Sequence, residues 1–257
     1  PISGMPGPSA DPSRLDPTDL SRRWRANAER HAVPPEAISE ITRCGGAGFA
    51  VLAGLPEIRD PHGRSYFAIP AGTPVAEVRS AVLATYVFNA GTGYPATRER
   101  NDFADTPYGA GEVARIRARQ DANAWSYPAA RRIAGTGGAL ATTPNGILIG
   151  IGGSWIAGRL SQRGGTTYGD VFLVNLDNRD DPARRLREII ASGGEPHRGR
   201  LPLDRLLHHE ERHCRQWARL GPVRMGVGYL AEELRARLTG GVNRFEEDAG
   251  LADGGYA

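Results

Sequence analysis

Apolar positions in the first half of the chain alternate between helical spacing and short uninterrupted runs. After Asp16 they recur at three- and four-residue intervals, and Thr73-Pro74 opens a second such pattern with a capping residue and a proline. Two short runs lie on either side of a turn-like segment at 60–63, which favours strands that could pair with each other. The pattern predicts helices from residue 16, over 35–45, 73–87, 111–120 and 128–133, and strands over 48–52 and 65–69.

Strand patterns dominate the chain between residues 139 and 175, and helical spacing returns after that. Pro144-Asn145-Gly146 is a strong hairpin signal between two apolar runs. The clearest helix covers 202–220, where His209 and His213 share the face that turns inward. The pattern predicts strands over 139–142, 147–151 and 168–175, and helices over 182–192, 202–220 and 222–238.

These elements predict an α+β protein, with an approximate domain boundary near Gly135. Residues 1–15 are rich in Pro, Gly, Ser and Asp, which is typical of a flexible linker and favours a fragment of a longer polypeptide. Residues 16–135 are predicted to form a mixed α/β module, to which the sequence assigns no role. Residues 136–257 are predicted to form a small α+β region in which the histidine-bearing helix packs on a short antiparallel sheet.

Composition excludes some partners. The chain has 257 residues, 40% of them hydrophobic, which is enough for a sizeable core. It contains no Lys, so all 32 basic residues are Arg, and acidic residues offset them to a net charge of +3. This bias is typical of a GC-rich, actinobacterial genome, and the scarcity of aromatic residues further disfavours a nucleic-acid partner. No stretch approaches the roughly 20 apolar residues that a membrane span requires.

The sharpest chemical signal is the stretch His209-Glu210-Glu211-Arg212-His213, an HExxH motif. Histidines at i and i+4 of a helix place their imidazoles one above the other, where both can reach a single tetrahedral metal ion such as zinc. The glutamate after the first histidine can then deprotonate a metal-bound water without ligating the metal. The plainer alternative is a pair of core histidines bonded to backbone carbonyls.

A catalytic zinc ion takes three protein ligands, so a third one is needed. Because no histidine follows His213, a third ligand downstream must be a carboxylate. Periodicity leaves two groups of candidates open, one on the predicted 222–238 helix and one after Gly240-Gly241. They are Glu232 and Glu233 in the first group, and Glu246, Glu247 and Asp248 in the second.

Residues 167–257 resemble a group of actinobacterial proteins with a C-terminal zincin-like region. The resemblance covers roughly the last third of the chain. It implies a gluzincin arrangement, in which Glu246 is the third zinc ligand and Ala249 lets its helix pack against the HExxH helix. It rests on Thr167-Tyr168-Gly169, on Leu206-Leu207-x-His209-Glu210-x-x-His213 with Gln216-Trp217, on Asn243-x-Phe245-Glu246-x-x-Ala249-Gly250-Leu251, and on Asp253-Gly254-Gly255-Tyr256.

The resulting expectation is a zinc-dependent hydrolase, a metallopeptidase before other classes, that acts on a peptide or protein. Glu210 is the expected base, with Tyr256 as the second catalytic residue; Tyr229 and several Arg are further candidates for stabilising an oxyanion. The 168–175 strand could pair with a peptide, although an ordinary core strand explains it better. The alternatives are a non-catalytic zincin-like module of an exported or cell-envelope protein, which binds a partner or serves only structure, and a metal-free packing region.

Overall fold

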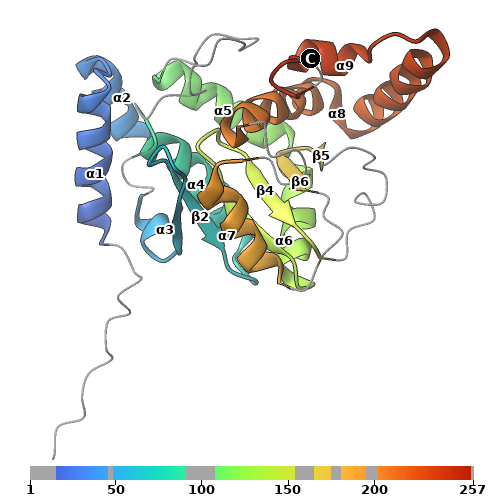
Figure 1. Ribbon diagram of the computed structural model, residues 1–257. Coiled ribbons are helices and arrows are strands. Elements are labelled where there is room, and N and C mark those ends of the chain that lie inside the picture. Colours follow the sequence, from blue (N-terminus) through green and yellow to red (C-terminus); the bar gives the residue numbers. More distant parts are fainter. Residues whose placement is uncertain are drawn as a thin grey trace, which may run out of the picture.

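The computed structural model describes residues 16–45, 49–90, 108–153, 165–174, 181–194 and 202–255. These residues form an α+β fold around one mixed sheet (Figure 1). The predicted linker 1–15 and Tyr256 lie outside the described residues. No helix in the described part of the chain is long and apolar enough to cross a membrane.

Six strands build the sheet in the order β1-β2-β3-β4-β6-β5. Neighbouring strands are antiparallel except for β4 and β6, which run parallel, so the expectation of a purely antiparallel sheet is corrected to a mixed one. The predicted boundary near Gly135 falls between α6 and β3, and strands from both sides of it join this one sheet. The strands are β1 (Glu57–Arg59), β2 (Ser65–Ile69), β3 (Ala139–Thr142), β4 (Leu148–Ile151), β5 (Gly165–Tyr168) and β6 (Val171–Val174).

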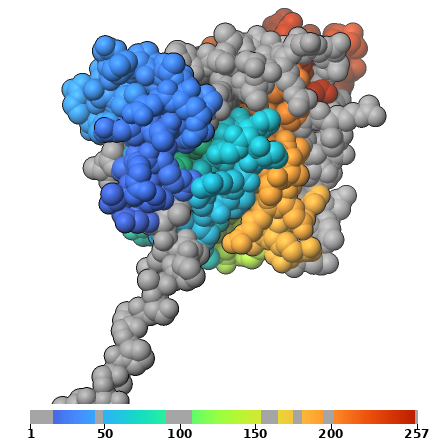
Figure 2. Space-filling model, turned by 60° about the vertical axis from the view of Figure 1, so that its left-hand side comes forward, coloured from blue at the N-terminus to red at the C-terminus, as the bar shows by residue number. Residues whose placement is uncertain are grey.

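Helices cover both faces of the sheet because alternate side chains of its strands are apolar in both directions. Leu148 and Leu173 belong to the core on one face, whereas Ile149 and Phe172 belong to the core on the other. The first core includes α4 (Val75–Phe88), α5 (Ala110–Ala122) and α6 (Tyr127–Gly135). The second includes α7 (Pro182–Ser192) and the start of α8 (Leu203–Thr239). Figure 2 shows α7, in orange, beside the cyan chain around β1.

Three N-terminal helices extend the first core: α1 (Pro17–Arg30), α2 (Pro35–Gly45) and α3 (Phe49–Ala53). The strand predicted at 48–52 is wrong for its described residues, because residues 49–52 belong to α3 and bury Phe49 and Leu52 three positions apart, while Gly48 lies outside the described residues. Short apolar runs fit a strand and a buried helix equally well. The strand at 65–69 is confirmed, but its partners are β1 and β3, and the predicted turn at 60–63 joins β1 to β2.

The long helix α8 is two helices joined at a break, as the sequence predicts. Gly221 has φ 74° and ψ 168°, a conformation open to glycine, and Pro222 follows it. The helix ends at Thr239 with Gly240, at φ 66°, as its C-cap, and a short turn leads to α9 (Arg244–Ala249). Figure 1 shows the second half of α8 and α9, in red, projecting beyond the sheet at one end of the molecule.

Candidate metal centre

The two histidines of the HExxH motif lie one above the other on the first half of α8. Their ring centroids are 4.6 Å apart, and the two Nε2 atoms approach to 3.1 Å. Only 2% of His209 and 6% of His213 is exposed, because this half of α8 packs on the sheet and under α9. The predicted placement of both histidines on the inward face is therefore confirmed.

Glu246 of α9 completes a cluster with the two histidines. Its Oε2 lies 3.2 Å from Nε2 of His209 and 3.4 Å from Nε2 of His213, and the residue is 6% exposed. Asn243 starts α9 as its N-cap, accepting from the Phe245 N–H, and so fixes the turn that carries Glu246. Among the described residues, His209, His213 and Glu246 are the group of ligand atoms close enough to share one metal ion.

The other carboxylates that periodicity left open are engaged elsewhere or point to solvent. Glu232 accepts from Arg235, and Glu233 accepts from Arg237, as expected for a solvated helix face. Asp248 accepts from Gln216, while Glu247 is exposed. The choice of Glu246, which came from the resemblance, is the one that the geometry brings to the histidines.

Backbone and side-chain acceptors determine which nitrogen of each histidine carries the proton. Nδ1 of His209 lies 2.9 Å from the carbonyl oxygen of Gly250, and Nδ1 of His213 lies 2.8 Å from Oε1 of Gln216. The Gln216 amide cannot be reversed without loss, because its Nε2 donates to the Phe245 carbonyl and to Asp248. Both Nδ1 atoms therefore act as donors, and each ring, in its neutral form, directs an Nε2 lone pair at Glu246.

Nε2 of His209, Nε2 of His213 and Oε2 of Glu246 thus point at one another, an arrangement that favours a cation between them. Tyr229 donates to Oε1 of Glu246 at 2.5 Å, while Oε2 is buried and faces Nε2 of both histidines. A buried carboxylate oxygen facing two lone pairs is costly unless a positive charge lies between them. Ligands about 2.0–2.2 Å from a tetrahedral zinc ion are roughly 3.3 Å from one another, which is the spacing seen here.

A proton can supply that charge when no metal is bound. Burial alone would lower the pKa of His213, but the hydrogen bond and negative charge of Glu246 outweigh burial and raise it to about 9. Burial alone would raise the pKa of Glu246, but both histidines hold it well below its usual range. A zinc ion entering the cluster would displace this proton, since metal ligation needs neutral imidazoles.

Glu210 lies beside the pair of histidines and is not part of the ligand group. Its Oε2 accepts from Oγ1 of Thr167 at 2.5 Å, and the residue is 8% exposed. Its negative charge contributes to the raised pKa of His213. Glu210 thus keeps a carboxylate near the cluster without entering it, as the motif predicts for a base.

Thr167 belongs to β5, the last strand of the sheet in the described part of the chain. Trp217 of α8 donates to its carbonyl oxygen at 3.0 Å, which ties β5 to the helix next to Glu210. The strand expected at 168–175 is β6, an interior strand between β4 and β5. The core-strand alternative is therefore confirmed for 171–174. The edge strand on this side of the described sheet is β5.

A buried network of ion pairs lies beneath the motif, and the sequence alone did not predict it. Arg119 pairs with both Asp170 and Glu211, and Arg115 and Arg215 also pair with Glu211. Burial alone would raise the pKa of Glu211, but the charges of these arginines lower it to about 2. The i,i+4 spacing of Glu211 and Arg215 is the part of this network that a sequence could have revealed.

A second interaction holds the chain after α9 against α8. Asp253 is fully buried, and its carboxylate contacts Nδ1 of His208 at 3.2 Å and accepts from Arg205 at 2.9 Å. His208 is only 1% exposed, so it is a buried supporting residue of the first half of α8. Asp253 secures the segment that presents the Gly250 carbonyl to His209.

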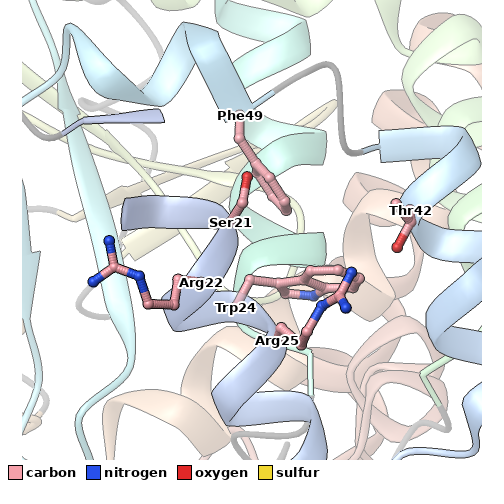
Figure 3. Close-up of a pocket in the computed structure, with 6 residues that line it drawn as sticks. All are labelled: Ser21, Arg22, Trp24, Arg25, Thr42 and Phe49. Carbon is pink, nitrogen blue, oxygen red and sulfur yellow. The ribbon is translucent and has the colours of Figure 1, made fainter. Parts of the chain in front are cut away.

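A pocket of about 310 Å³ lies far along the chain from this cluster, between the N-terminal helices (Figure 3). Ser21, Arg22, Trp24 and Arg25 of α1 line it together with Thr42 and Phe49. None of these side chains is a metal ligand of the usual kinds. The pocket therefore adds nothing to the metal centre.

Comparisons with known protein families, curated proteins and solved structures find no match to this chain. The geometry of the cluster is therefore the basis for proposing a function.

Proposed function

We propose that the protein is a zinc-dependent hydrolase, and a metallopeptidase before other hydrolase classes. The observation that carries the proposal is the convergence of two Nε2 lone pairs and one carboxylate oxygen, within 3.4 Å of one another, in a buried cluster. Both Nδ1 atoms already have acceptors, as they do at histidine-ligated zinc sites. His209, His213 and Glu246 would hold the zinc ion and leave a fourth position open.

Glu210 is the proposed general base. A bound zinc ion would lower the pKa of a water molecule and polarise a scissile carbonyl. With zinc bound, the carboxylate of Glu210 would accept the proton of that water and donate it to the leaving amine. Thr167 orients this carboxylate through its hydroxyl group, so we include Thr167, which the resemblance contained without a role, as a positioning residue.

A peptide substrate is favoured by the position of β5. This strand ends the described sheet and contacts the proposed base through Thr167, so an extended chain lying beside β5 would pass close to Glu210. Tyr229 is oriented by Glu246 and supports the ligand carboxylate. Tyr256 stays a prediction from the sequence, because it lies outside the described residues.

Two measurements test the proposal together. Protein purified without chelators should contain about one zinc ion per chain by elemental analysis, and should cleave a peptide library. Glu210→Gln should keep the zinc and lose more than about 100-fold of the cleavage rate, since general-base catalysis contributes on the order of 10²–10⁴. Glu247→Gln, an exposed neighbour of the third ligand, is the matched control and should retain both properties.

The second candidate is a non-catalytic zinc site that stabilises the contact between α8 and α9. It is favoured by the near-complete burial of Glu210 and by its hydrogen bond to Thr167. In that case the wild-type protein binds zinc and cleaves no peptide, and removal of zinc lowers the melting temperature. Protein without stoichiometric metal after zinc is supplied contradicts both candidates.

A further inference from the structure

The second half of α8 carries an exposed apolar stripe. Large apolar side chains recur at four-, three-, four- and four-residue intervals, which places them on one face of the helix. The opposite face carries Met225 and Ala236, both buried, and Tyr229, whose ring lies 6.0 Å from that of Phe245 in α9. The stripe consists of Val223, Val227, Leu230, Leu234 and Leu238, which are 75, 66, 66, 59 and 78% exposed.

The area of the stripe is that of an interface. Each of the five side chains exposes on the order of 100 Å², so the stripe presents roughly 500 Å², within the range of the largest apolar patch on a typical monomer. Two copies brought together with their flanking residues approach the roughly 1,200–2,000 Å² that stable complexes bury. Scattered exposed leucines are normal on a protein surface, whereas a continuous apolar patch often marks a binding site.

Four of the five stripe residues pair symmetrically along the helix, and Leu230 falls opposite Ala231, which favours a second copy of the chain as the occupant. About a centre between Leu230 and Ala231, an antiparallel copy of the helix places Val223 opposite Leu238 and Val227 opposite Leu234. Every apolar residue of the stripe then meets an apolar residue of the other copy. Such self-complementarity is the requirement of a two-fold symmetric interface.

The chemistry of this helix does not suit a lipid surface. Membrane-surface helices combine a Lys- or Arg-rich polar face with bulky apolar anchors, often aromatic. Here the stripe contains no aromatic residue, and Glu232 and Glu233 accompany the arginines of the helix. The face opposite the stripe packs on α9 and is not available as a solvated cationic surface.

We propose that the second half of α8 is a homodimerisation surface, on which two copies of the chain pack antiparallel about a two-fold axis at Leu230 and Ala231. The second half of α8 and α9 of each copy, which project from the sheet in Figure 1, would then form a four-helix arrangement with those of the other copy. The break at Gly221 directs this half of α8 away from the sheet, so that the arm is accessible to a second copy. This proposal does not depend on the metal centre.

Sedimentation equilibrium of the full chain tests the proposal, with a dissociation constant expected in the micromolar range or tighter. Leu234→Glu should weaken the dimer at least 100-fold, because symmetry buries two added charges. Ala118→Glu adds the same charge at an exposed position of α5 and should leave the dimer unchanged. A chain that is monomeric at 100 μM, or a dimer unaffected by Leu234→Glu, overturns the proposal.

Engineered cysteines test the antiparallel register. The Val227→Cys and Leu234→Cys double variant should form a covalent dimer on mild oxidation, because the two positions face each other across the axis. Each single variant should not cross-link, since its own copy lies about 10 Å away along the helix at 1.5 Å per residue. Cross-linking by Val227→Cys alone indicates a parallel arrangement and contradicts the proposed one. Circular dichroism confirms that each variant is folded.

Discussion

The two halves of α8 differ in what their apolar faces meet. In the first half, Leu203 and Leu207 are buried against the sheet, and the same packing buries His209 and His213. In the second half, an apolar stripe of similar spacing faces solvent. Helical periodicity is present in both halves, so the pattern alone does not say whether a face forms part of the core or awaits a partner. Only the surrounding structure separates a ligand-bearing helix from a docking helix.

The largest loss of stability should come from the network beneath the first half. Arg119→Met removes the charge that partners both Asp170 and Glu211, leaving two buried carboxylates undercompensated. We expect the free energy of unfolding to fall by about 3–5 kcal/mol, the usual cost of breaking a buried ion pair. Urea denaturation measures this. Arg117→Met, on the exposed face of the same helix, is the control and should change stability by less than about 0.5 kcal/mol.

Truncating matched leucines compares the two halves directly. Leu207→Ala in the first half should lower the free energy of unfolding by about 2–5 kcal/mol, because it opens a cavity in the core. Leu238→Ala in the second half should change it by less than about 0.5 kcal/mol when measured on monomeric protein. Equal effects in thermal or urea unfolding would mean that the two halves do not differ as described.

The metal centre should respond to changes around its ligands. Gln216→Leu removes the acceptor of His213 Nδ1, which frees the ring to take the other tautomer. We expect zinc affinity to fall about 10–100-fold, the usual effect of losing such a partner, with little change in the circular dichroism spectrum. Competition with a chromophoric chelator measures the affinity. An unchanged affinity would show that Gln216 does not orient the histidine.

The smallest expected effect concerns Thr167. Thr167→Val removes the hydroxyl group that Glu210 accepts from and keeps the shape of the side chain. Zinc affinity should be unchanged, and the cleavage rate should fall about 3- to 10-fold, corresponding to a hydrogen bond of roughly 1 kcal/mol. A fall in zinc affinity instead would place Thr167 among the supports of the ligands and not of the base.

Features that depend on neighbouring residues could be predicted from the sequence, whereas contacts between residues far apart in the sequence could not. The HExxH spacing, the inward face of the helix and the break before Pro222 all depend on neighbours in the sequence. Glu246 was one of several carboxylates on periodicity alone, because its contact with His209 crosses a turn of unpredictable geometry. The pairing of Arg119 with Glu211 spans 92 positions, and no local pattern encodes it. Residues 48–52 were predicted as a strand for a different reason, since a short apolar run fits a strand and a buried helix equally well.

The most direct test of the central claim is anomalous scattering at the zinc absorption edge, from crystals of protein prepared without chelators. The geometry predicts one strong peak between Nε2 of His209, Nε2 of His213 and Oε2 of Glu246. Its occupancy should be close to full, with a fourth position open to solvent or substrate. Crystals that show the same arrangement of the three side chains with no peak after zinc soaking would contradict the claim, and would identify the cluster as a protonated histidine–glutamate pair.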